Sequence, residues 1–373
     1  MPDSKEAEAL QRIRDGRSWS AFCRALEQAG QSILQAGTPS DAFDRAEGFR
    51  YLTRLLRAGL ESQLEYADPR QPGFYQLSNE TIKIGNDNPD NVYWNARISG
   101  RHEYRITGTR GAARLLCFAT KGGGYEKDGT LTPTGELHER QLVVAPDGRI
   151  EVRVSCAQQP GNWLPMRPDT TSLVVRQTFD DRRREEPARL AIECLDPGPA
   201  PALDPAELES NLLRAAAFVR GTADLFVGWM AHFAAHENQL PPDDQLRCQR
   251  AGGDSNIFYH NSRWRLAPDE ALLVLPRRVP RCDAWNFQVS NFWMESLDYR
   301  AHRIHLNQHS AVAEPDGHVR IVVAHRDPGP RFPNWLTTAG HTHGGMLFRW
   351  IGADEHPEID TRVVKLDDLL ASA

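Results

Sequence analysis

The chain has 373 residues, of which 40% are hydrophobic and 25% charged, and its formal net charge is -6 at pH 7. This length exceeds the usual size of one hydrophobic core, so we expect two packed units. The acidic balance argues against a nucleic-acid partner, because surfaces that track phosphates need a clustered positive excess. The six cysteines form no CxxC pair, so the sequence contains no local zinc-binding or redox dithiol motif.

The first predicted element is an N-terminal helical region, which we place at residues 1–70. From about Lys5 to Tyr66 the apolar residues recur at helical spacing. The N-terminus itself is charged and lacks the apolar run of a secretory signal. We therefore expect a cytoplasmic protein.

A first β unit is expected over residues 71–200, where short runs of β-branched and aromatic residues are separated by Gly, Asp and Asn. A proline-rich linker and a long apolar helix follow within 201–250. Arg220 and Asp224 in the middle of that helix argue against a span that faces lipid, so no membrane partner is expected. Strand patterning returns over 251–373, which predicts a second β unit.

Two stretches of the chain share one layout. Each opens with Pro-Asp-Gly, continues as an alternating strand, reaches Asn-Trp-Leu through a loop and ends in a strand that carries an arginine. The Asn-Trp-Leu triplets begin at Asn162 and Asn334. Repetition of order and spacing predicts two related β-sandwich units. We expect Trp163 and Trp335 to lie between the sheets, and each preceding Asn to hydrogen-bond its loop.

Several motifs in order extend this pattern: AEGFRYLTRLLRAGLE, GNDNPDNVYWNARISG, FWMESLDYRAHRIHLN, VRIVVAHRDPG, PNWLTTAGH and MLFRW. Together they resemble the bacterial family catalogued as domain of unknown function 1214. The resemblance covers most of the chain and implies a β-sandwich of jelly-roll character with helices, but no reaction. The stretch TTAGHTHGG departs from the charged residues often found there in the family, so a role for His343 would be particular to this chain.

The fold class expected is therefore α+β, with two related antiparallel β-sandwich (jelly-roll-like) units, an N-terminal helical region and a long connecting helix. The resemblance also draws attention to the asparagine- and aspartate-rich loop before the first strand. Its members Asp90, Asn91 and Tyr93 are candidate substrate-binding residues, although turn-making is the favoured explanation of such a loop.

A candidate catalytic carboxylate lies on a predicted strand from Ala284 to Tyr299. Alternation along this strand puts Glu295 on one face with Trp293 and Tyr299. A carboxylate desolvated by aromatic rings has a raised pKa and can act as a general acid or base near neutral pH. The alternative is that Glu295 pairs with a nearby arginine, Arg300 or Arg303, and only stabilises the strand end.

Histidines crowd the second β unit. Alternation puts His305 and His309 on one face, and His341 and His343 on another. Two such pairs on neighbouring strands could hold a divalent metal, Zn or Fe, with Glu295 as a further ligand. The alternative is that these are ordinary surface histidines, because no spacing here is diagnostic of a metal site.

These residues predict an enzyme that acts on a small, largely apolar organic molecule by lyase, isomerase or hydrolase chemistry. The catalytic set is Glu295, Tyr299, His305 and His341. The substrate-binding set adds Trp293 and Arg349, whose guanidinium could clamp a carboxylate or phosphate, to the three loop residues. The alternatives are a non-catalytic module for carbohydrate or another small ligand and an oligomeric scaffold, so a homo-oligomer stays open.

Overall fold

The computed structural model describes residues 4–199 and 201–371, which divide into two compact units. Of the described residues, unit 1 comprises those within Met1–Ile82, Val92–Thr178 and Glu185–Leu225, and unit 2 those within Lys83–Asn91, Phe179–Arg184 and Phe226–Ala373. The boundary between the units falls inside the long helix α5 (Pro205–Phe233). Each unit is described separately.

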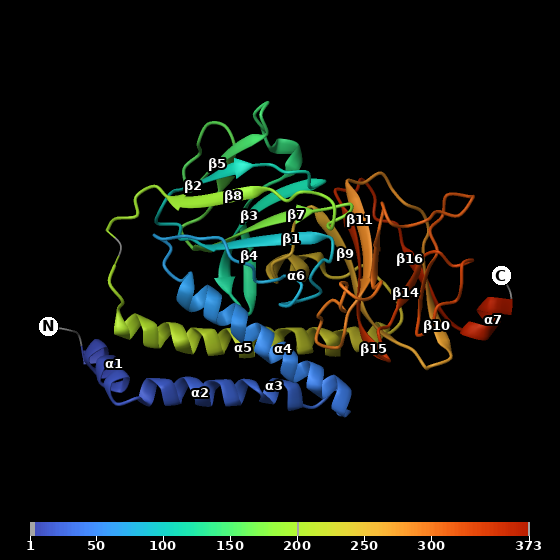
Figure 1. Cartoon of the computed structure of the whole chain (residues 1–373), viewed down its shortest axis with the longest axis horizontal. Coiled ribbons are helices and arrows are strands. Elements are labelled where there is room, and N and C mark those ends of the chain that lie inside the picture. Colours follow the sequence, from blue (N-terminus) through green and yellow to red (C-terminus); the bar gives the residue numbers. More distant parts are fainter. Residues whose placement is uncertain (1–3, 200, 372–373) are drawn as a thin grey trace. The chain divides into compact units, whose positions relative to one another are not determined.

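The N-terminal helical region predicted from the apolar spacing is confirmed in unit 1. It contains α1 (Ser4–Arg14), α2 (Arg17–Ala29), α3 (Gln31–Leu34), α4 (Ala42–Leu60) and a π-helical turn η1 (Glu61–Glu65) (Figure 1). Helix α4 begins after Asp41, whose carboxylate accepts a hydrogen bond from the Asp44 backbone N–H and caps the helix. None of the described helices is long and apolar enough to cross a membrane.

The β part of unit 1 consists of two four-stranded sheets, ordered β1-β7-β3-β4 and β6-β5-β2-β8. Their strands are β1 (Asn91–Arg97), β2 (Tyr104–Thr109), β3 (Leu115–Gly124), β4 (Thr130–Leu137), β5 (Arg149–Ser155), β6 (Trp163–Pro165), β7 (Thr170–Thr178) and β8 (Arg189–Cys194), with a 3-10 turn η2 (Glu139–Gln141) after β4. Alternate side chains of both sheets join one buried cluster that includes Phe118 and Val152. The two sheets therefore form a sandwich with its own core.

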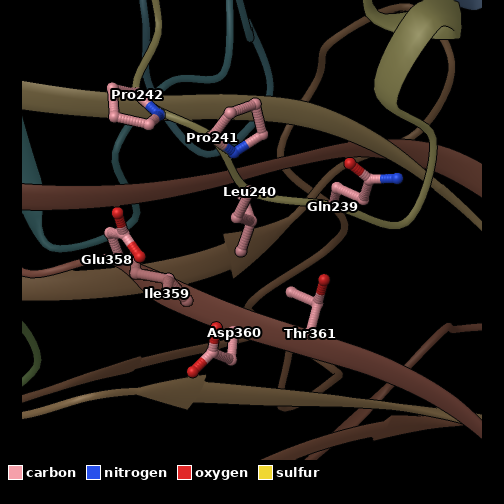
Figure 2. Close-up of a pocket in the computed structure, with 8 residues that line it drawn as sticks. All are labelled: Gln239, Leu240, Pro241, Pro242, Glu358, Ile359, Asp360 and Thr361. Carbon is pink, nitrogen blue, oxygen red and sulfur yellow. The ribbon is translucent and has the colours of Figure 1, made fainter.

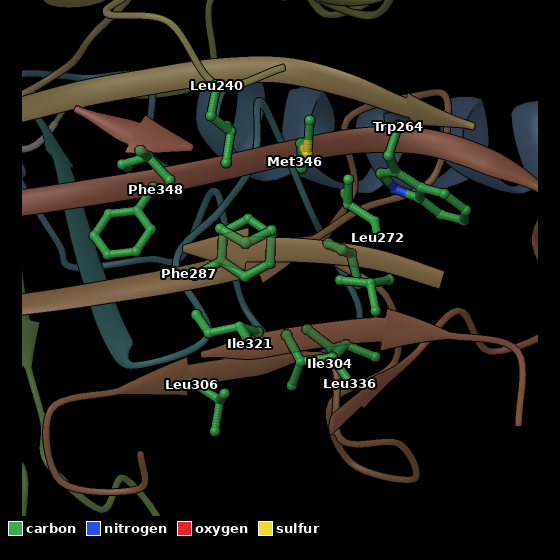
Figure 3. Packing of buried hydrophobic residues seen from close by; sticks show 14 of the residues in the cluster. Leu240, Trp264, Leu272, Phe287, Ile304, Leu306, Ile321, Leu336, Met346 and Phe348 are labelled. Atoms are coloured by element: carbon green, nitrogen blue, oxygen red, sulfur yellow. The ribbon is translucent and has the colours of Figure 1, made fainter. Parts of the chain in front are cut away.

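Unit 2 contains a second sandwich, with sheets ordered β9-β15-β11-β12 and β14-β13-β10-β16. Its strands are β9 (Ile257–Arg265), β10 (Glu270–Pro276), β11 (Ala284–Val289), β12 (His305–Asn307), β13 (Ile321–Ala324), β14 (Trp335–Thr337), β15 (His343–Ile351) and β16 (Ile359–Lys365). Phe287, Phe348 and Leu336 are among the side chains that fill the space between the sheets (Figure 3). The remaining helical elements are η3 (Ala234–His236), α6 (Gln245–Arg250) and α7 (Leu366–Ala371), of which α7 adds Leu366 and Leu369 to a second buried cluster with β10 and β13.

The two sandwiches have the same topology. Each strand of unit 2 occupies the sheet position of the unit 1 strand that is eight places earlier in chain order, so β9-β15-β11-β12 repeats β1-β7-β3-β4. The other pair of sheets follows the same rule, and both contain one parallel pair, β5 with β6 and β13 with β14. All other strand pairs with a described register are antiparallel. The predicted α+β fold with duplicated β units is therefore confirmed.

The predicted position of the repeated tryptophans is wrong. Trp335 is only half-buried, and its indole N–H donates to the carbonyl oxygen of Ala324 at 3.1 Å. The next residue, Leu336, is fully buried between the sheets. Unit 1 repeats this arrangement with Trp163 and Leu164. Since neighbouring side chains of a strand point to opposite faces, only one member of each Trp-Leu pair can face the core, and it is the leucine.

The predicted strand from Ala284 to Tyr299 is shorter in the structure. Strand β11 ends at Val289, and the chain then makes a tight turn closed by a single bridge between Ser290 and Ser296. Met294 within this turn has a φ of 55°, in the left-handed region that non-glycine residues seldom adopt. Alternation along a strand therefore cannot assign a face to Glu295.

Candidate functional site

The candidate site lies on the face of sheet β9-β15-β11-β12 that points away from the sandwich core. On β11, Trp285 and Phe287 belong to the core, whereas Asn286 and Gln288 alternate with them and point to the other side. The strand register places Asn286 opposite Asn307 on β12 and opposite Arg349 on β15. Amide and guanidinium groups from three strands thus share one surface, which we call the polar face.

A loop of unit 2, residues 83–91, packs on the polar face. Asn286 Nδ2 donates to Asn88 Oδ1 at 2.5 Å and to Asp90 Oδ2 at 3.0 Å. Asn307 Nδ2 donates to Asp90 Oδ1 at 2.9 Å. The loop needs glycine at position 85, because its φ is +62° and an added Cβ would lie 2.4 Å from the Phe226 ring. This asparagine- and aspartate-rich loop thus makes a turn, as predicted, and also contacts the polar face.

Asp90 also contacts a histidine of the polar face. His305 Nε2 lies 3.1 Å from Asp90 Oδ1, and the Asp90 side chain is 6% exposed whereas that of His305 is 25% exposed. An aspartate acceptor at Nε2 selects the tautomer in which Nε2 carries the proton and Nδ1 carries the lone pair. Among the described residues, His305 Nδ1 is shielded from solvent without a hydrogen-bond partner. The imidazole is therefore held by a carboxylate on one side and has a free basic nitrogen on the other.

Tyr299 lies beside this pair and is surrounded by positive charge. Its ring meets the ring of His305 edge-on, with 6.4 Å between the centroids. Arg182 Nη1 donates to the Tyr299 hydroxyl at 2.8 Å, and Lys83 Nζ lies 4.2 Å from the ring centroid. Lys83 is 2% exposed and donates to the backbone oxygen of Ser296 at 2.6 Å. The hydroxyl is thus oriented by a guanidinium, and a buried ammonium faces the ring.

Arg349 does not occupy the position expected of a substrate clamp. It is 4% exposed, and its Nη1 donates to Asn286 Oδ1 at 3.2 Å and to Gln288 Oε1 at 2.7 Å. Its Nη2 donates to the backbone oxygen of Asn86. The guanidinium therefore fastens the loop to the polar face. Arg182, which is only half-buried, is the more accessible arginine of the site.

Glu295 is fully buried, as its aromatic neighbours predict, but it is held by an amide. Its Oε2 accepts from Asn291 Nδ2 at 3.0 Å, and its backbone N–H donates to Asn291 Oδ1 at 3.1 Å. The two arginines considered as partners are engaged elsewhere: Arg300 binds Asp298 and Arg303 donates to the backbone oxygen of Pro333. The Glu295 side chain thus closes the turn after β11.

The remaining substrate-binding candidates have other described partners or lie in unit 1. Trp293 is 1% exposed and its ring packs against Phe292 at 5.1 Å between centroids. Asn91 is buried, and its backbone N–H donates to the Asn88 carbonyl oxygen at 3.0 Å. Tyr93 lies on β1 in unit 1. Only Asp90 of this group contacts a candidate catalytic side chain through a described hydrogen bond or ion pair.

The four histidines predicted as metal ligands do not converge. His309 is exposed and follows β12, whereas His341 is buried with its Nδ1 3.1 Å from the Thr338 carbonyl oxygen. His343 Nδ1 lies 3.2 Å from the hydroxyl of Thr342. Within residues 4–199 and 201–371, no three potential ligand atoms that include one of these histidines lie within 4.8 Å of one another. Turns at residues 307–310 and 338–341 interrupt the strand alternation on which that prediction relied.

A separate hollow of about 380 Å³ opens on the surface of unit 2. Two segments line it, 239–242 and 358–361, and Figure 2 shows their side chains. The acidic residues of this hollow, Glu358 and Asp360, pair with Arg277 at 2.7 and 3.1 Å. None of the residues predicted to be catalytic lines it.

Sequence reasoning missed two contributors to the candidate site, Lys83 and Arg182. Asn307 follows His305 by two residues in the same short strand, so strand alternation already predicted that the two share a face. Lys83 and Arg182 carry no such signal, because they come from two loops that are far apart in the chain and meet only in the folded unit.

The match to a family model agrees with the duplicated fold. The sequence model of a family described as "Protein of unknown function (DUF1214)" matches residues 94–178 and 271–355, one segment in each β unit. A solved structure of an uncharacterized protein from Burkholderia cenocepacia is 50% identical, with a TM-score of 0.94, and the match covers 96% of this chain and 99% of that one. The VPA0106 protein from Vibrio parahaemolyticus is 13% identical with a TM-score of 0.48, and the match covers 85% of this chain and 98% of that one. The comparison with curated proteins found no match.

Proposed function

Because this chain belongs to the DUF1214 family, whose description assigns no activity, its function has to be argued from its own side chains, and we propose an enzyme that uses acid–base chemistry. The reaction belongs to the lyase, isomerase or hydrolase type, and the substrate is a small organic molecule. The observation that carries the proposal is the pair formed by Asp90 and His305 on the polar face.

His305 acts as the base in this proposal. Its Nε2 is 3.1 Å from Asp90 Oδ1, so the carboxylate orients the ring and stabilises the imidazolium that forms when Nδ1 takes a proton. Asp90 is 5% exposed, which keeps water from competing for this contact. A quarter of the His305 side chain is exposed, but Nδ1 itself is shielded, so a substrate has to displace the groups that cover this nitrogen.

Tyr299, with the neighbouring Arg182 and Lys83, stabilises negative charge that forms on the substrate in this proposal. The Tyr299 hydroxyl accepts from Arg182 at 2.8 Å, and a phenol can donate a hydrogen bond as well as accept one. Arg182 and Lys83 place positive charge at 5.3 and 4.2 Å from the ring centroid. Negative charge that develops on a substrate oxygen next to Tyr299 is stabilised by these cations. This favours a substrate with a carbonyl or carboxylate group, rather than the largely apolar molecule predicted from the sequence.

The reaction class that fits these roles best is removal of a proton from a carbon next to a carbonyl group. His305 takes the proton, and Tyr299 with Arg182 stabilises the resulting enolate oxygen. A cytoplasmic location, expected from the sequence, remains part of the proposal, as does a jelly-roll description of the sandwiches.

The experiment is a hydrogen-exchange assay. The full-length protein is incubated in deuterated buffer with a panel of small ketones, aldehydes and 2-oxo acids, and loss of the carbon-bound proton signal is followed by NMR. His305→Gln and Tyr299→Phe should each lower the exchange rate by about 10²–10⁴-fold, the range typical of a lost general acid or base. His309→Gln is the matched control, because His309 is exposed and lies in the turn that follows His305.

Exchange at the wild-type rate in folded His305→Gln protein would overturn the assignment. Binding of a panel member without exchange or turnover, unchanged by His305→Gln, would instead support the second interpretation, a non-catalytic small-ligand module. The melting temperature of each variant shows whether a loss of activity reflects chemistry or unfolding.

A further inference from the structure

The face of unit 1 that corresponds to the polar face of unit 2 carries a different set of reactive side chains. In unit 2, Phe287 on β11 pairs with Leu306 on β12, and in unit 1 Phe118 on β3 pairs with Leu137 on β4. The residues beside these pairs are therefore equivalent as well: Cys117 corresponds to Asn286, His138 to Asn307 and Glu136 to His305.

These three side chains of unit 1 form a chain of contacts. Cys117 Sγ lies 3.4 Å from His138 Nδ1. On the other side of the same ring, His138 Nε2 lies 3.4 Å from Glu136 Oε2. Lys121 Nζ lies 3.8 Å from the second oxygen, Glu136 Oε1, which holds the carboxylate in place. Thiol, imidazole and carboxylate thus follow one another in the order used by cysteine nucleophiles.

The surroundings fix this arrangement while leaving it accessible. Lys121 is 3% exposed and Glu136 12% exposed in their side chains, whereas 24% of the His138 side chain is exposed. Cys117 is half-buried. His138 is also the N-cap of the short turn η2: its side chain accepts a hydrogen bond from the Gln141 backbone N–H, and its backbone N–H donates to Gln141 Oε1 at 3.0 Å. The ring therefore has little freedom to rotate away, and a ring nitrogen has to release the Gln141 N–H to take up a proton.

We propose that Cys117 is a nucleophile that accepts acyl groups from activated esters or thioesters, with His138 as its base and Glu136 as the positioning residue. His138 Nδ1 takes the thiol proton, and Sγ attacks the carbonyl carbon of the acyl donor to form a new S–C bond. The bond from that carbon to the leaving oxygen or sulfur breaks, and the leaving group takes the proton from His138. Water, deprotonated by His138, then hydrolyses the thioester, and the thiol regains its proton.

The residues named for this site differ from those of the proposed acid–base site, so variants test the two proposals separately. The acylation step needs no oxidant or metal ion, because the acyl donor supplies both the acyl group and the leaving group. The chemistry relies on the imidazole, since a cysteine thiol at neutral pH is mostly protonated.

The test uses the full-length protein and p-nitrophenyl acetate at neutral pH. We expect a burst of one equivalent of p-nitrophenolate and the addition of one acetyl group, located on Cys117 by peptide mass spectrometry. Cys23, which is exposed, serves as the internal reference thiol, and Cys117 should be acetylated at least about tenfold faster, as an activated thiolate is. This comparison within the unmodified protein does not depend on whether any variant folds.

Variants then assign the roles. Cys117→Ser should abolish the burst, and Cys23→Ser should leave it unchanged. His138→Gln should slow acetylation of Cys117 by about 10²-fold, while iodoacetamide should still label the thiol at a reduced rate. Glu136→Gln keeps the shape of the side chain, and a burst reduced less than in His138→Gln would fit a positioning residue. Acetylation of Cys117 no faster than Cys23, or an unchanged rate in folded His138→Gln protein, would overturn the proposal.

Discussion

Asn334 makes in unit 2 the same three side-chain hydrogen bonds that Asn162 makes in unit 1. In each unit the amide oxygen accepts from one backbone N–H, at 2.8 Å for Asn334 and 2.7 Å for Asn162. The amide nitrogen donates to two backbone oxygens, which are those of Val312 and Arg320 in unit 2 and of Val143 and Glu151 in unit 1. One side chain thus ties together three segments at the same place in both sandwiches.

Replacement of either asparagine by alanine should destabilise its unit. Asn334 is 2% exposed, so Asn334→Ala leaves buried backbone groups unpaired and should cost about 2–4 kcal/mol. Asn162 is half-buried, so water can replace part of its bonding and Asn162→Ala should cost less. Urea unfolding followed by tryptophan fluorescence measures both values. A larger loss for Asn162→Ala than for Asn334→Ala would contradict this account.

The neighbouring Trp-Leu pair tests which residue fills the core. Leu336→Ala should lower the free energy of unfolding by about 2–5 kcal/mol, because Leu336 is fully buried between the sheets. Trp335→Phe removes the hydrogen bond to Ala324 but keeps a ring of similar position, and should cost about 1 kcal/mol. If Trp335→Phe proved the more damaging change, the tryptophan would have to be the core residue after all.

Gly344 on β15 marks a close approach of the turn that follows β11. A Cβ at this position would lie 2.0 Å from the Ser290 carbonyl oxygen, which also accepts from the Trp264 indole N–H at 3.3 Å. Gly344→Ala should therefore destabilise the protein by about 2–3 kcal/mol. Gly228 on α5 is exposed with open space around it, so Gly228→Ala should instead stabilise by about 0.5–1 kcal/mol. Thermal unfolding of the two variants should shift the melting temperature in opposite directions.

A pH dependence follows from a buried histidine of β9. His260 is fully buried, its Nδ1 lies 3.0 Å from the Leu240 carbonyl oxygen, and burial lowers its pKa to about 4. Between the ordinary pKa of 6.5 and that value the unfolded chain binds a proton that the folded chain does not. Stability should thus be complete above the ordinary pKa and fall by about 3 kcal/mol as the pH drops through this window. Burial also lowers the pKa values of His236 and His356, which act in the same direction.

The contribution of His260 can be separated from that of the other two histidines. His260→Leu removes the titrating group and should flatten the decline in the free energy of unfolding between these pH values, whatever its effect at neutral pH. His318→Leu, a substitution at an exposed histidine, is the control. A decline in His260→Leu as steep as in the parent protein would assign the pH dependence to other groups.

The sequence predicted the duplicated architecture because turn residues and strand alternation are local signals. The two Asn-Trp-Leu triplets indicated the repeat. The alternation of Asn286 and Gln288 with Trp285 and Phe287 indicated that one face of β11 is polar. Glu295 was wrongly assigned to a strand, because the left-handed turn is made by Met294 and no glycine indicates it in the sequence.

Contacts between strands and between distant segments could not be predicted, because the sequence carries only local signals. Cys117 and His138 are neighbours across β3 and β4, but a register shift beside Lys121 and a proline in β4 obscure the pairing in the sequence. Asp90 and His305 come from segments separated by most of the chain, and no local pattern connects them. Tertiary packing alone brings such pairs together.

Because the strands of both sandwiches follow the same order, each position in one sandwich has an equivalent position in the other, and side chains can be moved between them. The side chains of Cys117, Glu136 and His138 could be transplanted to positions 286, 305 and 307, where the backbone pairing around Phe287 and Leu306 matches that around Phe118 and Leu137. Such a graft would test whether the three side chains are sufficient for acylation of the cysteine, or whether the surrounding loops are also needed.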